Sequence, residues 1–361
     1  MKILYVFNHP AFYKISFLNE LGKHCDLTVM IERKKARDRN VMFYQTNTKY
    51  SFSLQYLSGI NIGTENHLSL GIINHLKRHQ YDFIIMNGYA TFTEMLTINY
   101  LKRHQIPFIL MINGGIINHQ ESKFKRRLKT KYISSATYYL SPTVTSNEYL
   151  VYYGAKKDHI IQYPYSSLSE SQYFTSTASA LEKETIKQEF MLDKDRKVIV
   201  SVAQFIERKN NLLFINLAEQ FPHVTFVLVG EGPEKRKYLR IIAKKRLTNL
   251  IIKDFMPHSS LLRLLRGSDL LFAPSSKDIY GHTILEGLYN NIWVLASSHI
   301  NAAREFKNNP NLHIFNENSE IAGKIAKLLG STPLNNDVSL LDYSFEKAAR
   351  TVFKRLEELK R

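Results

Sequence analysis

Apolar runs alternate with amphipathic stretches along the N-terminal half of the chain. The apolar runs predict strands at residues 2–8, 26–31, 53–57, 83–86, 108–112 and 137–140. Helical periodicity between them predicts helices at residues 12–23, 68–78 and 93–104. Strands that alternate with helices build parallel sheets. The N-terminal half is therefore predicted to form one doubly wound α/β domain.

The pattern is interrupted and then repeats. Residues 163–180 are rich in Ser, Thr and Tyr without periodicity, which is typical of a linker. A second alternating series follows, with apolar runs opening residues 197–205, 225–233, 249–257, 269–275 and 292–297. Residues 343–361 have the pattern of an amphipathic helix. The chain is thus predicted to contain two Rossmann-like domains, residues 1–165 and 191–340, with a linker at 166–190 and a C-terminal helix at 341–361.

Composition is consistent with a folded protein of two domains. The chain has 361 residues, of which 44% are hydrophobic and 22% charged. Its single cysteine, Cys25, excludes an intrachain disulfide and suits a reducing compartment. No run of about 18 apolar residues predicts a membrane span, and the apolar start is too short for a signal peptide. A cytoplasmic location is expected.

The net charge of +17 calls for an anionic partner, and residues 1–165 account for +11 of it. Within that half, residues 122–133 place Phe124, Leu128 and Tyr132 at helical spacing among six cations, from Lys123 to Lys131. Such a basic amphipathic helix favours contact with an anionic membrane surface. The alternative is an ordinary surface helix whose apolar stripe packs inward.

Residues 273–297 carry the clearest candidate chemistry. They predict a strand, a loop, a helix beginning near His282 and a second strand, with Asp278 in the loop beyond the first strand's carboxyl end. The turn at Tyr280-Gly281 would leave free N–H groups at the helix start, where an anion can bind. Glu286, one turn later, could accept hydrogen bonds from the hydroxyls of a ribose. Two carboxylates beside an anion site suggest a sugar nucleotide, whereas each alone would be an ordinary turn or surface residue.

A second glycine-rich turn follows the strand that ends at Val229. Gly230 and Gly232 allow the backbone to approach a ligand closely, and a proline then opens a helix. The third glycine of a dinucleotide fingerprint is missing, and no acidic residue follows at the expected strand end. A nicotinamide cofactor is therefore disfavoured.

Residues 197–297 resemble the retaining family 4 glycosyltransferases of the GT-B fold, in which an acidic residue, seven residues and a glutamate precede a helix. Asp278 stands here where that family usually has glutamate, and Glu286 matches the second acid. The loop 202–210 resembles the family's phosphate-binding loop. Lys209 matches its lysine and Gln204 replaces its arginine. The resemblance implies two Rossmann-like domains facing a cleft, with the C-terminal helix crossing back to the first domain.

The resemblance also implies roles for these residues. Asp278 would contact the transferred sugar, Glu286 the ribose, and Lys209 the diphosphate, and these three are the expected catalytic residues. The loop 254–257 would lie against the nucleobase. The full set implied to bind the nucleotide sugar is Gln204, Lys209, Gly230, Gly232, Met256, Tyr280, Gly281, His282, Thr283 and Glu286.

On the N-terminal side, two turns at strand ends are expected to face the acceptor. They contain Asn8, Tyr13, Lys14, Asn113, Gly114 and Gly115. Retaining enzymes of this fold need no protein nucleophile, because the leaving diphosphate can take the acceptor's proton. No metal or cofactor is expected, since Lys209 and helix N-termini would supply the positive charge.

The favoured hypothesis is a cytoplasmic glycosyltransferase, peripherally bound to the inner face of the membrane. It would move a hexosyl unit from a UDP- or GDP-linked sugar to a lipid-linked or polymeric glycan in capsule, exopolysaccharide or cell-wall synthesis. One alternative is a nucleotide-sugar epimerase of the same fold, although no proton-transfer pair is evident. Another is a non-catalytic basic scaffold or nucleic-acid-binding protein, although no nucleic-acid module is recognisable and nucleic acid is not the expected partner.

Overall fold

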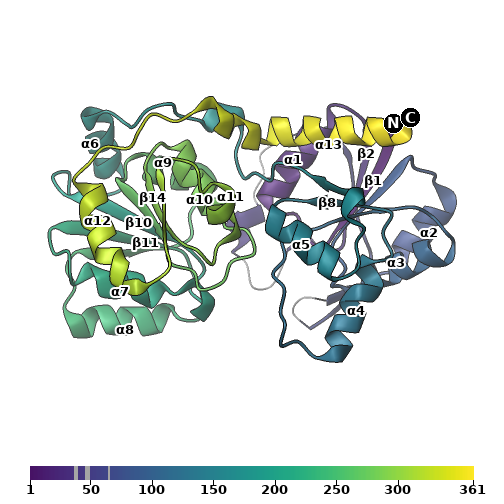
Figure 1. Ribbon diagram of the computed structural model, residues 1–361, viewed down its shortest axis with the longest axis horizontal. Coiled ribbons are helices and arrows are strands. Elements are labelled where there is room, and N and C mark those ends of the chain that lie inside the picture. Colours follow the sequence, from purple (N-terminus) through teal and green to yellow (C-terminus); the bar gives the residue numbers. More distant parts are fainter. Residues whose placement is uncertain (36–39, 45–48, 64–65) are drawn as a thin grey trace. The chain divides into compact units, whose positions relative to one another are not determined.

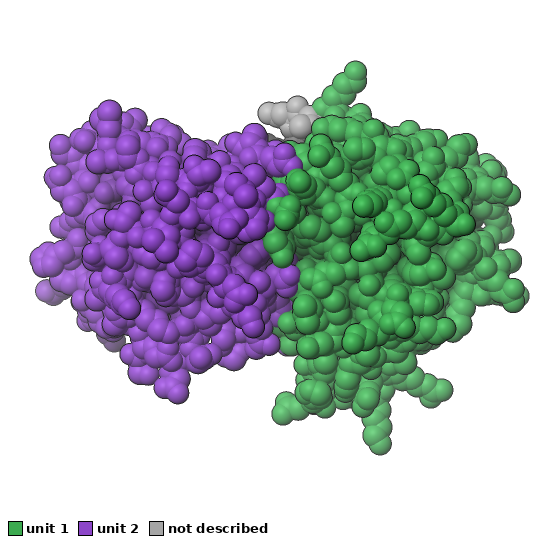
Figure 2. Space-filling view, turned by 45° about the horizontal axis from the view of Figure 1, so that its top comes forward, with its two compact units in different colours: residues 1–166, 342–361 green, residues 167–341 purple. Residues whose placement is uncertain are grey.

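The computed structural model describes residues 1–35, 40–44, 49–63 and 66–361. The chain divides into two compact units, which Figure 2 colours separately. Unit 1 comprises residues 1–166 and 342–361, and unit 2 comprises residues 167–341. Each unit contains its own parallel sheet covered by helices (Figure 1), as the alternating pattern predicts.

Unit 1 is built on a seven-stranded parallel sheet in the order β3-β2-β1-β6-β7-β8-β9. Its strands are β1 (Lys2–Phe7), β2 (Asp26–Ile31), β3 (Ser53–Tyr56), β6 (Phe83–Asn87), β7 (Ile109–Met111), β8 (Tyr138–Ser141) and β9 (Ile160–Gln162). Its helices are α1 (Phe12–Gly22), α2 (Gly71–Arg78), α3 (Phe92–Arg103), α4 (Lys123–Ile133), α5 (Val144–Tyr152) and α13 (Phe345–Lys360), with 3-10 turns η1 (Val41–Tyr44) and η2 (Lys157–His159).

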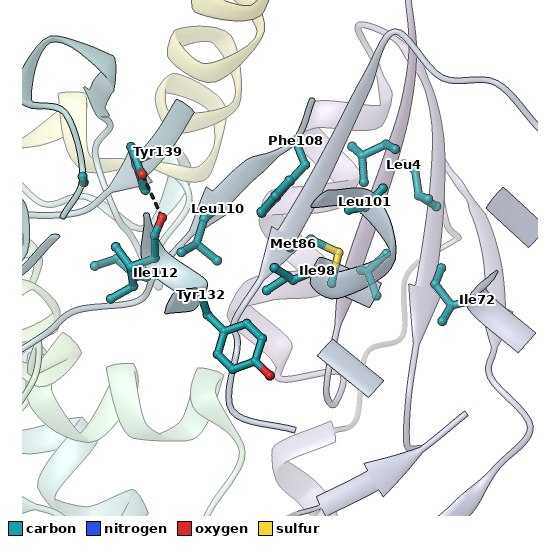
Figure 3. Close-up of a cluster of buried hydrophobic side chains, with 14 of the residues drawn as sticks. Leu4, Ile72, Met86, Ile98, Leu101, Phe108, Leu110, Ile112, Tyr132 and Tyr139 are labelled. Atoms are coloured by element: carbon teal, nitrogen blue, oxygen red, sulfur yellow. Dashed lines mark hydrogen bonds between the residues drawn. The ribbon is translucent and has the colours of Figure 1, made fainter. Parts of the chain in front are cut away.

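A buried apolar cluster lies between this sheet and helices α2 to α5. Leu4, Met86 and Leu110 enter it from three adjacent strands, and Ile72 and Ile98 meet them from α2 and α3 (Figure 3). Side chains buried on both faces of the sheet explain why its inner strands are nearly continuous apolar runs.

The prediction for unit 1 missed helix α5, strand β9 and a short hairpin. Strands β4 (Ile60–Ile62) and β5 (Asn66–Leu68) form an antiparallel hairpin in which Ile60 lies opposite Leu68. The helix expected at residues 68–78 begins only at Gly71, because its expected first residue belongs to β5. Strands of three residues are too short to show a period of two, so the pattern could not reveal them.

Unit 2 has a six-stranded parallel sheet in the order β12-β11-β10-β13-β14-β15. Its strands are β10 (Lys197–Val202), β11 (Val224–Val229), β12 (Leu250–Lys253), β13 (Leu270–Ala273), β14 (Trp293–Ser297) and β15 (Leu312–Phe315). Its helices are α6 (Ala180–Glu189), α7 (Asn211–Ala218), α8 (Lys235–Lys245), α9 (His258–Arg266), α10 (His282–Tyr289), α11 (Asn301–Glu305) and α12 (Ile321–Leu329). The 3-10 turns are η3 (Glu170–Gln172), η4 (Glu207–Lys209), η5 (Asn318–Glu320) and η6 (Val338–Tyr343), the last of which spans the boundary between the units.

The five predicted strands of unit 2 are all present, and β15 is an additional short strand at the edge of the sheet. The segment 166–190, predicted as a linker, includes the helix α6 at its C-terminal end. Ser179 caps this helix by accepting a hydrogen bond from the Glu182 N–H group. Capping by a serine side chain is a local signal for a helix start, and it lies at the end of the Ser- and Thr-rich stretch.

The C-terminal helix returns to unit 1, as predicted. The residues from Ser167 to Leu341 belong to unit 2, whereas the chain from Asp342 onward belongs to unit 1, where α13 packs along α1 (Figure 1). Its buried stripe consists of Phe345, Ala348, Ala349, Val352 and Leu356. The spacing of these residues follows the period of the α-helix, which is why the sequence predicts both the helix and its buried face.

Candidate functional site

The candidate donor site of unit 2 lies where the strand order reverses. Strands β10 and β13 are neighbours in the sheet, and the chain leaves their carboxyl ends in opposite directions. In open α/β sheets this switch point is where ligands bind. Lys209 ends the 3-10 turn after β10, and Asp278 lies in the loop after β13. The topology therefore brings together two motifs that are 69 residues apart in the sequence.

Lys209 and Asp278 form an ion pair. The Lys209 Nζ donates to Oδ2 of Asp278, and their side chains are only 15% and 12% exposed. The two loops are also joined through backbone: the Ser276 N–H group donates to the Arg208 carbonyl at 2.9 Å. The positions of both charges are thus fixed by the packing of these loops as well as by their mutual attraction.

Gly281 sets the start of helix α10. Its φ is +97°, and a Cβ atom there would lie 2.4 Å from a methyl group of Ile300. A residue with a side chain would be both strained and in collision. The helix then begins at His282, as predicted, and its first N–H groups are the ones for which the sequence predicts an anion.

Glu286 lies on the second turn of α10 and is 4% exposed. Its Oε1 accepts a hydrogen bond from the Ser167 hydroxyl at 2.8 Å and lies 3.1 Å from Nε2 of His258. Burial alone would raise the pKa of this carboxyl, but the hydrogen bond and charge of His258, together with the charge of His282 and the hydrogen bond of Ser167, lower it. Glu286 is therefore ionised at neutral pH.

His282, Tyr280 and Thr283 support this turn in different ways. Burial lowers the pKa of His282 to about 4, although Glu286 and Asp278 oppose the shift, so its imidazole is neutral at neutral pH. The Tyr280 ring is buried and packs on the His282 ring, with centroids 4.8 Å apart. The Thr283 side chain is half-buried and has no hydrogen-bond partner among the described residues.

The two glycines after β11 serve loop packing. A Cβ atom on Gly230 would lie 1.9 Å from the Ala203 carbonyl oxygen, and one on Gly232 would lie 2.6 Å from that of Phe205. Both residues also have positive φ. They let the loop after β11 lie against the loop after β10. In the loop after β10, the Gln204 side chain is half-buried and has no hydrogen-bond partner among the described residues. The glycines therefore position Gln204 and its neighbours.

The loop after β12 contains Met256, which is half-buried, and leads through Pro257 into helix α9. Asp254 at the start of this loop is paired with Lys235 of α8. His258, the first residue of α9, is the link from this loop to Glu286. Sequence reasoning missed both His258 and Ser167, because neither belongs to a motif that marks it.

In unit 1 the corresponding switch point lies between β1 and β6. Lys14 of α1 donates a 2.7 Å hydrogen bond to Asn87 at the end of β6, and Asn87 in turn pairs with Asn113 after β7. Burial lowers the pKa of Lys14 to about 8, against the opposing effect of Glu94 and Glu32. Lys14 is therefore part of a buried hydrogen-bonded chain and presents little surface to an acceptor.

The other residues predicted for the acceptor side have varied surroundings. The Asn8 side chain accepts a hydrogen bond from the next backbone N–H group. Tyr13 lies edge-on to Tyr165, and with Lys14 and Asn113 it lines a cavity of about 10 Å³, too small for a sugar. Gly114 has a φ of +135°. Gly115 lies under the ring of Tyr149, which a Cβ atom would approach within 2.4 Å.

Two buried carboxyl groups beside Lys14 were not predicted. Glu32 follows β2 directly, accepts a 2.7 Å hydrogen bond from the Thr91 hydroxyl and is 2% exposed. Its Oε2 has no hydrogen-bond partner among the described residues. Glu94 caps the N-terminus of α3 together with Thr91, and this Thr-x-x-Glu pattern was a signal that the sequence offered. Burial and the Glu94 charge raise the pKa of Glu32 to about 8.

Helix α4 partly fits each of the two predictions made for it. Tyr132 is buried and Leu128 half-buried, as in an ordinary surface helix. Phe124 is 75% exposed, and the cations of the first two turns are exposed around it. Lys129 differs from them, because it pairs with Glu121 at 2.6 Å and lies over the Tyr153 ring. The first turns of α4 remain available for an anionic surface, and membrane binding stays a prediction.

The described residues include no group of three or more His, Cys, Asp or Glu side chains placed to hold a metal ion. The chain does contain an Asp-x-Asp pattern, Asp193-Lys194-Asp195. It precedes β10, at the edge of the sheet opposite Lys209, and Asp193 pairs with Arg196 at 3.0 Å. In the described part of the chain, no helix combines the length and apolarity that a membrane span requires.

Comparison with known proteins finds similarity to glycosyltransferases. Residues 182–340, which include every candidate donor-site residue, match the family model "Glycosyl transferases group 1". A curated relative, the processive diacylglycerol alpha-glucosyltransferase of Acholeplasma laidlawii, is 26% identical over 133 residues. That match covers 36% of this chain and 40% of the relative, so the chain spans less than half of the relative's length.

Solved structures show that the fold of the whole chain is GT-B. The Anabaena protein Alr3699/HepE, solved with UDP and glucose, superposes with a TM-score of 0.73 at 15% identity, covering 100% of this chain and 97% of that one. The UDP-GlcNAc 2-epimerase of Neisseria meningitidis, bound to UDP-GlcNAc, has a TM-score of 0.67 at 16% identity, covering 99% and 100%. Proteins with different activities thus share this fold, so function has to be argued from the site.

Proposed function

We propose that the protein is a retaining glycosyltransferase that transfers a hexosyl unit from a nucleotide sugar, UDP- or GDP-linked, to a lipid-linked or polymeric glycan acceptor. The observation that carries the proposal is the grouping of Lys209, Asp278 and Glu286 at the switch point of the unit 2 sheet. One cation and two carboxylates match the parts of a nucleotide sugar: a diphosphate, a sugar and a ribose. The site lies within the segment that matches the glycosyltransferase family model.

Each group has a defined task in this proposal. The Lys209 ammonium and the first N–H groups of α10 bind the diphosphate, since both present positive charge to the same place. Asp278 accepts hydrogen bonds from hydroxyls of the transferred sugar. Glu286, ionised at neutral pH, accepts from the ribose. The ion pair with Asp278 holds Lys209 over the donor before the donor arrives.

The transfer exchanges one C–O bond for another at the anomeric carbon. The bond to the diphosphate oxygen breaks as the acceptor hydroxyl oxygen bonds from the same face, so the configuration is retained. The acceptor's proton passes to the leaving diphosphate. Lys209 and the α10 N-terminus stabilise the negative charge that develops there, which is the largest electrostatic contribution such a site can make. The proposed reaction requires no metal ion.

The proposed acceptor follows from a curated relative and from the surface of helix α4. The relative from Acholeplasma laidlawii acts, by its name, on diacylglycerol, which favours a lipid or lipid-linked acceptor. Exposed Phe124 and the cations around it suit an anionic membrane. We place the enzyme in the cytoplasm on the inner face of the membrane, in capsule, exopolysaccharide or cell-wall polysaccharide synthesis. The UDP and glucose bound to the Anabaena protein favour UDP-glucose as the first donor to test.

The test has two stages. Thermal unfolding is measured with UDP-, GDP- and ADP-sugars in the absence of metal, for the wild type and Lys209→Met, because a ligand that binds the folded state raises the unfolding temperature. The nucleotide sugar that stabilises the wild type but not Lys209→Met is then incubated with the wild-type protein and vesicles containing diacylglycerol. Appearance of glycosylated lipid with release of the nucleoside diphosphate supports the proposal. Conversion of the sugar without an acceptor would instead identify an epimerase, and no stabilisation by any nucleotide sugar would contradict both.

A further inference from the structure

The two carboxylate oxygens of Glu286 differ in their surroundings. Oε1 accepts from the Ser167 hydroxyl at 2.8 Å and lies 3.1 Å from His258 Nε2. Among the described residues, Oε2 has no hydrogen-bond partner. A carboxylate oxygen has two acceptor positions, so two donors occupy Oε1 fully. Only Oε2 is available to a ligand.

The two donors come from parts of unit 2 that are distant in sequence. Ser167 is the first residue of the unit and is buried, and it precedes Glu286 by 119 residues. His258 opens α9 directly after the loop 254–257, and its side chain is 18% exposed. Neither residue belongs to α10, which carries Glu286. Their convergence on one oxygen therefore fixes the orientation of the carboxylate without contributing to the helix itself.

We propose that His258 and Ser167 are positioning residues that hold Glu286 with Oε2 facing the ribose, and that they thereby make the site discriminate ribonucleotides from 2′-deoxyribonucleotides. This inference rests on the proposed function, because it takes the ligand of Glu286 to be a ribose. A single carboxylate oxygen held in place accepts from the ribose hydroxyls in one geometry. A nucleotide without the 2′-hydroxyl leaves a buried charged acceptor under-satisfied, which is strongly unfavourable.

His258 also bears on the charge of Glu286. The charges around Glu286 come from four groups. His258 from α9 and His282 from α10 act on Glu286 directly. Lys209 from the loop after β10 and Asp278 from the loop after β13 act on the neighbouring His282. The hydrogen bond and charge of His258 are the main influences that lower the pKa of Glu286 against burial. Without His258 the carboxyl keeps its proton to higher pH. The acid limit of nucleotide binding then moves upward in pH, a change that a merely structural role for His258 would not produce.

The experiment compares UDP with 2′-deoxy-UDP by calorimetry between pH 5 and 8. The wild type should bind UDP roughly tenfold more tightly, since one hydrogen bond to a charged acceptor is worth about 1.5 kcal/mol or more, and Glu286→Gln should bind both nucleotides alike. His258→Ala should lose most of the preference and show its acid limit at higher pH, whereas His258→Gln, which keeps a donor, should retain most of it. His223→Ala, at an exposed histidine of the same unit, is the matched control.

The outcomes separate this inference from the proposed function. If the wild type binds neither nucleotide, and no GDP or ADP compound either, the proposed function fails. If the wild type prefers UDP and His258→Ala keeps the same preference and the same acid limit, the positioning role is overturned while the function stands. Should His258→Ala fail to fold, as judged by circular dichroism, His258→Gln and Ser167→Ala carry the test, and the serine variant is expected to lose part of the preference.

Discussion

The Lys209 ammonium donates to the Asp278 carboxylate across 69 residues of sequence, at the point where β10 and β13 lie side by side. The proposed function gives the lysine to the diphosphate and the aspartate to the sugar. In the structure the two residues also hold each other, so a substitution at either affects both stability and ligand binding. The effect on stability can be separated from the effect on ligand binding, because a second substitution can remove the charge that the first one leaves unpaired.

Lys209→Met should abolish stabilisation by the nucleotide sugar and lower transfer roughly 100- to 1,000-fold, as expected for loss of one charge-stabilising donor. It should also lower the free energy of unfolding by roughly 1–3 kcal/mol, because Asp278 is left without its cation. Adding Asp278→Asn should restore most of the stability and none of the activity. Lys244→Met, on the exposed side of α8, is the control and should change neither quantity. If the double variant recovered transfer activity as fully as it recovers the free energy of unfolding, Lys209 would affect activity only by stabilising the fold.

Gly230→Ala should destabilise unit 2 by at least about 2 kcal/mol, since the added methyl group would lie 1.9 Å from the Ala203 oxygen on a backbone with positive φ. Gly323→Ala is the matched control. That glycine lies within α12 with nothing within 4 Å of the added Cβ, so the change should stabilise by roughly 0.5–1 kcal/mol through helix propensity. Urea unfolding of the two variants measures the contrast. Similar midpoints would show that the loop after β11 can move aside.

The buried carboxyl of Glu32 predicts a pH dependence of stability. Its pKa is raised to about 8 in the folded state, whereas the ordinary value is 4.5. Between these values the unfolded chain releases the proton and the folded chain keeps it, so this group's contribution is full below pH 4.5 and is lost as the pH rises through 8.

Glu32→Gln removes that titration and keeps an oxygen for the Thr91 hydroxyl. Relative to the wild type, the variant should therefore become more stable as the pH rises from 5 to 9, by up to about 1.4 kcal/mol for each pH unit. Parallel urea titrations across this range measure the difference. A constant offset between the two proteins would show that Glu32 is already ionised at pH 5.

The exposed first turns of α4 predict binding to anionic vesicles. Lys125→Glu with Arg127→Glu should weaken sedimentation with such vesicles by roughly 10- to 30-fold, since each cation near an anionic surface contributes about 1 kcal/mol. High salt should weaken the wild type in the same way. The control is Arg240→Glu with Lys244→Glu on α8, which makes the same change in net charge on unit 2. If both double variants lost vesicle binding equally, the binding would depend on net charge and not on α4.

The sequence by itself determined most of the secondary structure and the division into two parallel-sheet domains. The period of the apolar residues is a local property, and it placed β10 to β14, α10 and the buried stripe of α13 because burial selects those positions directly. Gly281 and the start of α10 at His282 were predictable for a similar reason, since a turn with positive φ requires glycine. The three-residue strands β4 and β5 were not, because they are shorter than any readable period.

Only the tertiary structure decided which side chains meet. Nothing near Glu286 in the sequence indicates that Ser167 and His258 share its Oε1, and nothing near Lys14 indicates that it is buried beside Glu32 and Glu94. These contacts depend on the order in which the strands join each sheet, which places loops from different parts of the chain at one edge. The charge state of Glu286 and Glu32 follows from the same contacts, because burial and neighbouring charges shift a pKa and neither is a local property of the sequence.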